Sequence, residues 1–507
     1  MKHNIFFLFL ICISIGTNAQ RQSLNYLVQQ VSEDSLKTFE NTVAGEAFQG
    51  RMAASEGDSL CIRFIADLYK TYHLSNPFRT SNPYLQNVPL KYLDYSASKL
   101  TVLGKEYDAD DQWLYFIGSN NFGPATGEVV FIGYGISIPK FDELKDIDIG
   151  GKFVLMNWGS PKDSSGKDVI RSKDMPNDED QAKSIIFKKP LGMLIYEPDF
   201  KTTHGQINEF RTFEPFFDFS RPNGTNINGA IISSELSKLA LGLNLDSIYS
   251  LIGGSGKPHS FNTHKQVTLS VIRNDRKTST KNIIGLIKGT DTTLSCIVLS
   301  AHHDHFGKIQ GKTYFGADDN GTGTTALLEI ARILGNAATK GIRPNRTIIF
   351  LSTGAEEQGL IGGSYYTNNP VISLAKTYCD INIDMVSRVD SFHIGTNRDS
   401  NYIYCLYYDT SNKVFSRSKL ETLNNSCCNL VLDTLYDRKS RKINEGGLIT
   451  RSDNFPFLEK GIPAVFLFGG FHKDYHQPTD TIDKINYSLL KRRTQLALTM
   501  LWQLGNE

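Results

Sequence analysis

Five short apolar runs in the second half of the chain constrain the fold more than any other feature. They are residues 283–287, 297–299, 347–351, 381–383 and 464–468, and most are rich in Ile, Val and Phe. Runs of this kind are typical of strands buried on both faces. Helical segments lie between them, including 323–334 and the closing stretch 484–504. Alternating strands and helices predict an α/β fold with a mixed, largely parallel sheet sandwiched by helices.

The middle of the chain has a different pattern. Residues 129–136 and 152–156 are β-branched and aromatic runs bounded by glycines, which predicts a small β-rich domain inserted at about 115–265. The flanking stretches, 20–114 and 266–507, then form the N-terminal and main parts of one larger domain.

The N-terminus resembles an export signal. Lys2 precedes an apolar run, Ile5–Ile11, and small residues end in Ala19. This order predicts a signal peptide, residues 1–19, and a protein exported to the periplasm or the extracellular space. The run is too short to span a bilayer, and no later stretch reaches that length, so we expect no stable membrane insertion.

Composition excludes several classes of function. The 507 residues carry 54 basic and 53 acidic side chains, a balance that gives no indication of nucleic-acid binding. The chain has only 7 cysteines, too few for a disulfide scaffold. An ordinary folded enzyme fits these values, and they leave its oligomeric state open.

Polar clusters follow the predicted strands, where open α/β sheets place their ligands. Taken singly, each cluster could be a turn, a helix cap or a solvated loop. His302 and Asp304 share a face of an extended segment, whereas His303 points away. The clusters are 302–305, 318–319, 356–357, Asp384 and 474–480.

Together the clusters predict a metal centre. Histidines and carboxylates without thiolates, three to an ion, fit catalytic zinc with an open position. A carboxylate between two such sets holds two ions about 3.5–4 Å apart. Adjacent Glu356 and Glu357 point in different directions, so one can bind metal while the other handles protons. Either Asp318 or Asp319 could supply the central carboxylate.

The motifs resemble those of metallopeptidase family 28, the di-zinc exopeptidases that include secreted bacterial aminopeptidases. The matching segments are Ala301–Asp304, Gly316–Gly323, Gly354–Ser364, Ile383–Met385 and Tyr475–Asp480. The middle stretch, with Gly133-Tyr134-Gly135-Ile136, is similar to a protease-associated domain inserted in such enzymes.

The resemblance implies a metal ligand set. His302 and Asp384 would hold one zinc ion and Glu357 and His476 the other, with Asp319 bridging them. The residue before Asn320-Gly321 matches the bridge better than Asp318 does.

The resemblance also implies catalytic roles. Glu356 would be the general base, Asp304 would orient His302, and Tyr475 would stabilise the oxyanion. The peptide bond between Asp319 and Asn320 would be cis.

The function that follows is hydrolysis of peptides, with an aminopeptidase as the first hypothesis. A glutamate carboxypeptidase-like enzyme would need a basic pocket, for which Arg343, Arg388 and Arg451 are candidates. A glutaminyl cyclase of the same family uses one zinc ion. A receptor that has lost catalysis would lack ligands, yet all five are present here.

Overall fold

The computed structural model describes residues 22–107, 112–115, 122–171, 174–176, 178–200, 213–215, 229–309, 311–397, 399, 401–436 and 447–507. The chain forms two compact units, Met1–Leu90 with Thr278–Glu507, and Lys91–Lys277. The predicted insert, 115–265, lies inside the second unit, whose boundaries are wider. The predicted signal segment, 1–19, is outside the described residues. Within these ranges, no helix combines the length and apolar character that crossing a membrane requires.

The first unit is built on a mixed sheet with a parallel centre. From β1 onward, the spatial order of its strands is β1 (Leu85–Asp94), β13 (Asn274–Ile287), β17 (Ile348–Thr353), β14 (Cys296–His302), β18 (Thr377–Asp384), β21 (Ala464–Phe468), β19 (Tyr402–Tyr408) and β20 (Val431–Asp433). Strands β17, β14, β18 and β21 are mutually parallel, while β13 and β19 are antiparallel to their neighbours in this central group. The α/β fold class expected from the sequence is confirmed.

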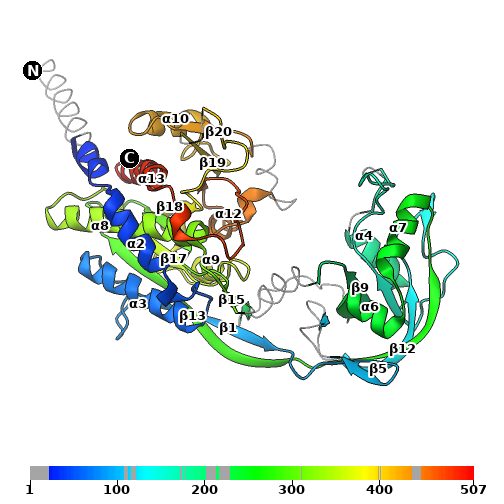
Figure 1. Cartoon of the computed structure of the whole chain (residues 1–507). Helices are drawn as coiled ribbons and strands as arrows, with labels where there is room; N and C mark the ends of the chain where they lie inside the picture. The colour runs from blue at the N-terminus through cyan, green and yellow to red at the C-terminus, as the bar shows by residue number, and fades with distance from the viewer. Residues whose placement is uncertain are drawn as a thin grey trace, which may run out of the picture. The chain divides into compact units, whose positions relative to one another are not determined.

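Helices cover both faces of this sheet because its strands are apolar on both sides (Figure 1). Ile297 and Leu299 belong to one core cluster, which Leu327 joins from the helices on that face. Val298 belongs to the opposite cluster, with Tyr366 and Phe457. The helices of the first face are α2 (Glu33–Val43), α3 (Glu56–Thr71), α8 (Gly323–Thr339) and α13 (Tyr487–Gly505); those of the second are α9 (Ile361–Asn368) and α12 (Asn454–Glu459).

Short elements complete the first unit. They are η1 (Glu46–Phe48), the hairpin of β15 (Gly307–Ile309) and β16 (Lys312–Tyr314), the π-turn η2 (Ala317–Thr322), η3 (Leu374–Lys376), α10 (Arg417–Asn425), η5 (Leu448–Thr450) and η6 (Ile482–Lys484). After α10, Cys427 and Cys428 form a disulfide between adjacent residues. The other described cysteines are buried thiols outside any disulfide.

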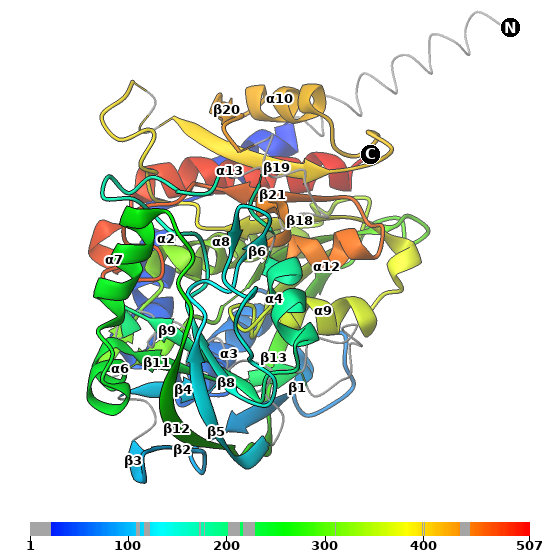
Figure 2. The same cartoon turned by 90° about the vertical axis from the view of Figure 1, so that its right-hand side faces the viewer.

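The second unit has its own mixed sheet (Figure 2). Its strands, in spatial order, are β3 (Lys105–Tyr107), β2 (Lys99–Val102), β12 (Phe261–Val271), β5 (Phe122–Phe131), β8 (Phe153–Met156), β9 (Gly192–Glu197), β11 (Gly229–Ser233) and β4 (Trp113–Tyr115). Further elements are the β6 (Ser137–Ile138) and β7 (Phe141–Asp142) pair, β10 (Phe213–Pro215), α4 (Asp178–Phe187), α6 (Ser234–Leu241) and α7 (Leu245–Ser255). Apolar side chains of α6 and α7 pack on one face and Ile185 of α4 on the other.

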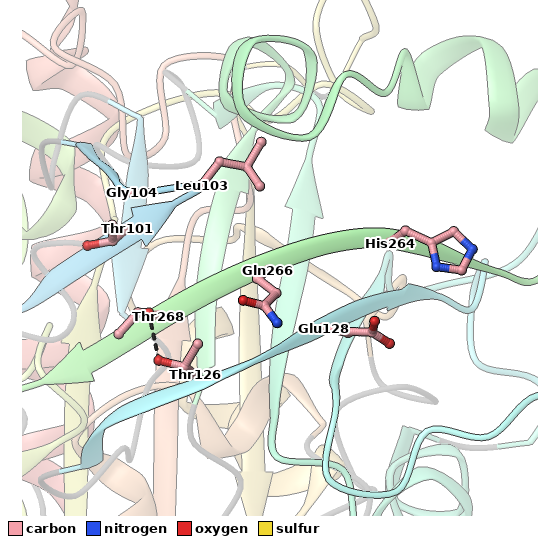
Figure 3. A pocket seen from close by; sticks show the side chains of 8 residues that line it. All are labelled: Thr101, Leu103, Gly104, Thr126, Glu128, His264, Gln266 and Thr268. Atoms are coloured by element: carbon pink, nitrogen blue, oxygen red, sulfur yellow. Dashed lines mark hydrogen bonds between the residues drawn. The ribbon is translucent and has the colours of Figure 1, made fainter.

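One face of β2, β12 and β5 carries a shallow polar hollow of about 390 Å³ (Figure 3). Its lining residues are Thr101, Leu103, Gly104, Thr126, Glu128, His264, Gln266 and Thr268. Along β12 these alternate with the buried Val267 and Leu269, as expected for a half-buried sheet. Thr126 and Thr268 share a hydrogen bond of 2.8 Å between their hydroxyls. The hollow is the solvated side of this sheet.

Candidate metal centre

Strand register brings the polar clusters of the first unit to one edge of its sheet. His302, the last residue of β14, pairs with Thr353, the last of β17. Asp384, the last of β18, pairs with Phe468, the last of β21. All four strands are parallel, so the segments after them emerge side by side. Their carboxyl ends are where the sequence placed the site.

The first group of buried residues that can bind a metal contains His302 and two carboxylates. His302 Nε2 lies 3.4 Å from Asp384 Oδ2, 3.9 Å from Glu356 Oε2 and 3.9 Å from Asp319 Oδ1. His302, Glu356 and Asp384 can each direct one ligand atom to a common point. Ser452 holds Asp384 by donating a hydrogen bond of 2.7 Å to Oδ2.

Asp319 reaches from this group to a second one. Its Oδ2 lies 3.0 Å from His476 Nε2, while Oδ1 faces His302. His476 Nε2 is also 3.6 Å from Glu357 Oε2. A carboxylate with one oxygen toward each imidazole has the arrangement required of a bridge. The Asp319–Asn320 peptide bond is cis, as the resemblance implies.

Asp318 faces away from both groups. Its Oδ1 accepts hydrogen bonds from Ser387 N, at 2.9 Å, and from Thr322 Oγ1, at 3.0 Å. Its Oδ2 lies 3.3 Å from His472 Nε2. With both oxygens engaged elsewhere, Asp318 anchors the turn and Asp319 remains the candidate bridge.

His305 is a member of the site that the sequence did not predict. Its Nδ1 lies 2.6 Å from Glu357 Oε1, and His305, Asp319 and Glu357 form the second group able to converge on one point. His305 follows β14 by three residues, where alternation along a strand no longer decides direction. In the sequence, only its position three residues after His302 could have indicated this role.

The other two residues of this segment have separate partners. His303 points away from the site, as expected, with Nε2 3.1 Å from Asp58 Oδ1 and Nδ1 3.0 Å from Ser352 Oγ. Asp304 accepts hydrogen bonds from the backbone N–H groups of Glu356 and Glu357, at 3.1 and 3.3 Å. Its carboxylate lies 3.9 Å from His302 Nδ1, beyond hydrogen-bonding distance. The hydrogen bonds that Asp304 accepts therefore come from the segment that carries the two glutamates.

Two further charged residues support the site and were not assigned a role from sequence. The buried guanidinium of Arg51 donates to backbone carbonyls of His303 and Gly316, at 2.6 and 2.9 Å, and so braces the segments on either side of the centre. Asp480 Oδ2 accepts from the backbone N–H groups of Asp318 and Asp319, at 3.0 and 3.1 Å.

Aromatic rings enclose His476. The ring of Tyr475 stacks on it with a centroid separation of 3.7 Å, and Phe306 meets it edge-on at 4.6 Å. Tyr475 therefore lies beside the centre, which is compatible with the role that the resemblance implies for it.

Crowding of buried carboxylates shifts the protonation of the site. Burial raises the pKa of Glu356 and of Glu357 well above the usual value, and the Asp319 carboxylate adds to the effect on Glu357. Burial lowers the pKa of His302, but the carboxylates of Glu356 and Asp384 outweigh this and hold it well above normal. The site thus attracts positive charge, and a cation can take the place of protons.

The donor set fits a divalent metal. Imidazole nitrogens and carboxylate oxygens converge without thiolates, as in catalytic zinc sites. Among the described residues, the buried His302 Nε2 and Asp384 Oδ1 have no hydrogen-bond partner. Burial of unpaired polar atoms is costly, and a metal ion would satisfy both of them.

Comparison with known sequences identifies relatives. A profile of peptidase family M28 matches residues 282–501. The aminopeptidase YwaD of Bacillus subtilis is 29% identical over 252 residues, covering 47% of this chain and 48% of that protein. The glutamate carboxypeptidase 2 homolog of Caenorhabditis elegans is 26% identical over 414 residues, covering 70% and 50%. The chain thus spans about half the length of these relatives.

Solved structures share the fold. The zinc aminopeptidase BSAP from Bacillus subtilis aligns with a TM-score of 0.58 at 18% identity, covering 93% of this chain and 95% of that one. The aminopeptidase from Aneurinibacillus sp. strain AM-1 gives a TM-score of 0.55 at 18% identity, covering 94% and 95%.

Proposed function

We propose that the chain is a member of peptidase family M28, whose profile matches residues 282–501, and that it is an exopeptidase that uses two zinc ions to hydrolyse peptides. One observation carries the proposal: Asp319 directs one oxygen toward His302 and the other toward His476. His302 and Asp384 would hold one ion, Glu357 and His476 the other, and Asp319 both. When bound, zinc would polarise the scissile carbonyl and lower the pKa of water.

The chain's own residues supply the proton transfers. Glu356 is buried beside His302, and its backbone N–H is held by Asp304. We assign it as the general base that takes a proton from the attacking water and passes it to the leaving amine. We assign Tyr475, whose ring stacks on His476, as the residue whose hydroxyl donates a hydrogen bond to the oxyanion.

An aminopeptidase is favoured over a carboxypeptidase. Acidic side chains around the centre suit a free α-amino group, whereas a terminal carboxylate needs a basic partner. Arg388 is ion-paired with Asp474 at 2.8 Å. Arg343 precedes β17, at the strand end opposite to the site. Arg451 is exposed next to Ser452 and is the remaining candidate of the three.

Substrate hydrolysis tests the proposal. We expect the purified chain to cleave amino-acyl substrates with a free amino terminus, to leave N-blocked versions intact, and to lose activity with a chelator. Cleavage of N-blocked peptides from the carboxyl end, abolished by Arg451→Ala, would support the carboxypeptidase instead. Formation of pyroglutamate from N-terminal glutamine would indicate a cyclase, and no turnover of any substrate would indicate a receptor.

Two parts of the proposal concern the rest of the chain. The N-terminal residues support export with cleavage after Ala19, which mass spectrometry of the secreted protein would test by finding Gln20 as its first residue.

The second unit, Lys91–Lys277, contains the segment similar to a protease-associated domain, and we propose that identity for it.

A further inference from the structure

His305 makes a direct contact with one of the proposed zinc ligands. Its Nδ1 lies 2.6 Å from Oε1 of Glu357, the shortest imidazole–carboxylate contact among the described residues of the centre. Glu357 Oε2 lies on the other side, 3.6 Å from His476 Nε2. One oxygen of this carboxylate is therefore held by His305, and the other faces His476.

The surrounding chain is shaped around the His305 ring. The side chain is fully buried and stacks on Phe306 with a centroid separation of 4.6 Å. Residue 316 is glycine with φ of 55°, and a Cβ atom there would lie 2.3 Å from Cγ of His305. Any side chain at position 316 would collide with the ring, so this glycine leaves the space that His305 occupies.

The neighbouring His303 shows what a purely structural histidine does in the same segment. It is equally buried, but its two nitrogens contact Asp58 and Ser352. Neither Asp58 nor Ser352 belongs to the two groups that can converge on a metal. The contact of His305 with Glu357 is thus a specific property of position 305.

We propose that His305 is a positioning residue for the second zinc ion, donating a hydrogen bond from Nδ1 to Glu357 Oε1 and so fixing Oε2 toward the metal. This inference rests on the proposed di-zinc function. A donor to the outer oxygen of a ligating carboxylate restricts its rotation, and loss of such a partner typically weakens metal affinity about 10–100-fold.

Zinc affinity of the full chain tests the proposal without reference to catalysis. Titration against a chromophoric chelator gives two stepwise dissociation constants. We expect His305→Ala to raise one constant about 10–100-fold and to leave the other unchanged. His305→Asn places an amide N–H near the position of Nδ1 and should restore a value close to that of the wild type. His303→Asn is the matched control, with both constants unchanged.

Two results would overturn the proposal. If His305→Ala binds both ions as tightly as the wild type, His305 does not position Glu357. If His305→Asn is as weak as His305→Ala, His305 acts as a direct ligand or as packing rather than through an Nδ1 donor. Either result leaves the proposed function intact as long as the wild type binds two ions. A wild type that binds fewer refutes the di-zinc proposal itself and His305's role with it.

Discussion

Both compact units bury carboxylates beyond the carboxyl ends of parallel strands, but they stabilise them differently. In the second unit, burial raises the pKa of Glu143 to about 8, and Glu143 Oε2 accepts backbone hydrogen bonds from Tyr134 and Ile136. A single buried carboxylate of this kind can be neutralised by binding a proton. In the first unit, Asp319, Glu356, Glu357 and Asp384 meet around His302, at the convergence of two metal-compatible groups. Several buried acids at one point, interleaved with imidazoles, need cations.

The first prediction separates two adjacent acids of the first unit and has the largest expected effect. Asp319→Ala should lose both zinc ions and all activity, because this carboxylate faces both groups. Asp318→Asn should keep both ions, because Asp318 accepts hydrogen bonds from Ser387 and Thr322 and its other oxygen faces His472. Metal analysis of the two purified variants measures the difference. Equal zinc loss in both would break the assignment of the bridge.

The second prediction asks whether the acids of the first unit divide their roles. Glu356→Gln should retain two zinc ions while kcat falls about 10²–10⁴-fold, since the change removes the proton acceptor and preserves shape. Steady-state kinetics and metal content on the same sample give the result. Wild-type kcat in this variant would remove Glu356 from the mechanism.

The third prediction concerns the lone acid of the second unit. Folded Glu143 keeps its proton up to about pH 8, whereas an unfolded glutamate releases it near 4.5. The free energy of unfolding of this unit should therefore fall as pH rises from 4.5 to 8, by about 2–4 kcal/mol. Hydrogen exchange of the β5 and β8 amides in the full chain measures this free energy at each pH.

Glu143→Gln is the control for this effect. It should abolish the pH dependence of the free energy of unfolding, obtained after the exchange rates are corrected for intrinsic exchange at each pH, and leave the zinc content unchanged. An unchanged pH dependence in the variant would mean that other groups of the second unit cause it, and the contrast between the two units would lose its basis.

The sequence was sufficient for the architecture of the first unit and for the edge of its sheet at which the polar clusters meet. Apolar runs such as 464–468 coincide with a strand, and the predicted helix 484–504 is α13, shifted to Tyr487 because Asn486 caps it by accepting from Leu489 N. Register along β14 and β17 then brings His302 beside the segment carrying the glutamates. These features follow from local pattern and from the parallel arrangement of the strands.

Other features depend on contacts that no local pattern encodes. Arg51 reaches the centre from a loop more than 250 positions earlier in the chain, through carbonyl groups of His303 and Gly316. His305 lies past the end of β14, where its direction depends on the space beside Gly316. The hydrogen bonds from the backbone N–H groups of Glu356 and Glu357 to Asp304 likewise join segments about 50 positions apart, which the residues around position 304 do not predict.

The zinc content of the wild-type chain tests the account most directly. After equilibration with excess zinc and removal of loosely bound metal, elemental analysis should find two zinc ions per chain. Two ions are expected because His302, Asp384 and Asp319 would hold one, and Glu357, His476 and Asp319 would hold the other. One equivalent or fewer would contradict the central claim that Asp319 bridges a pair of metals.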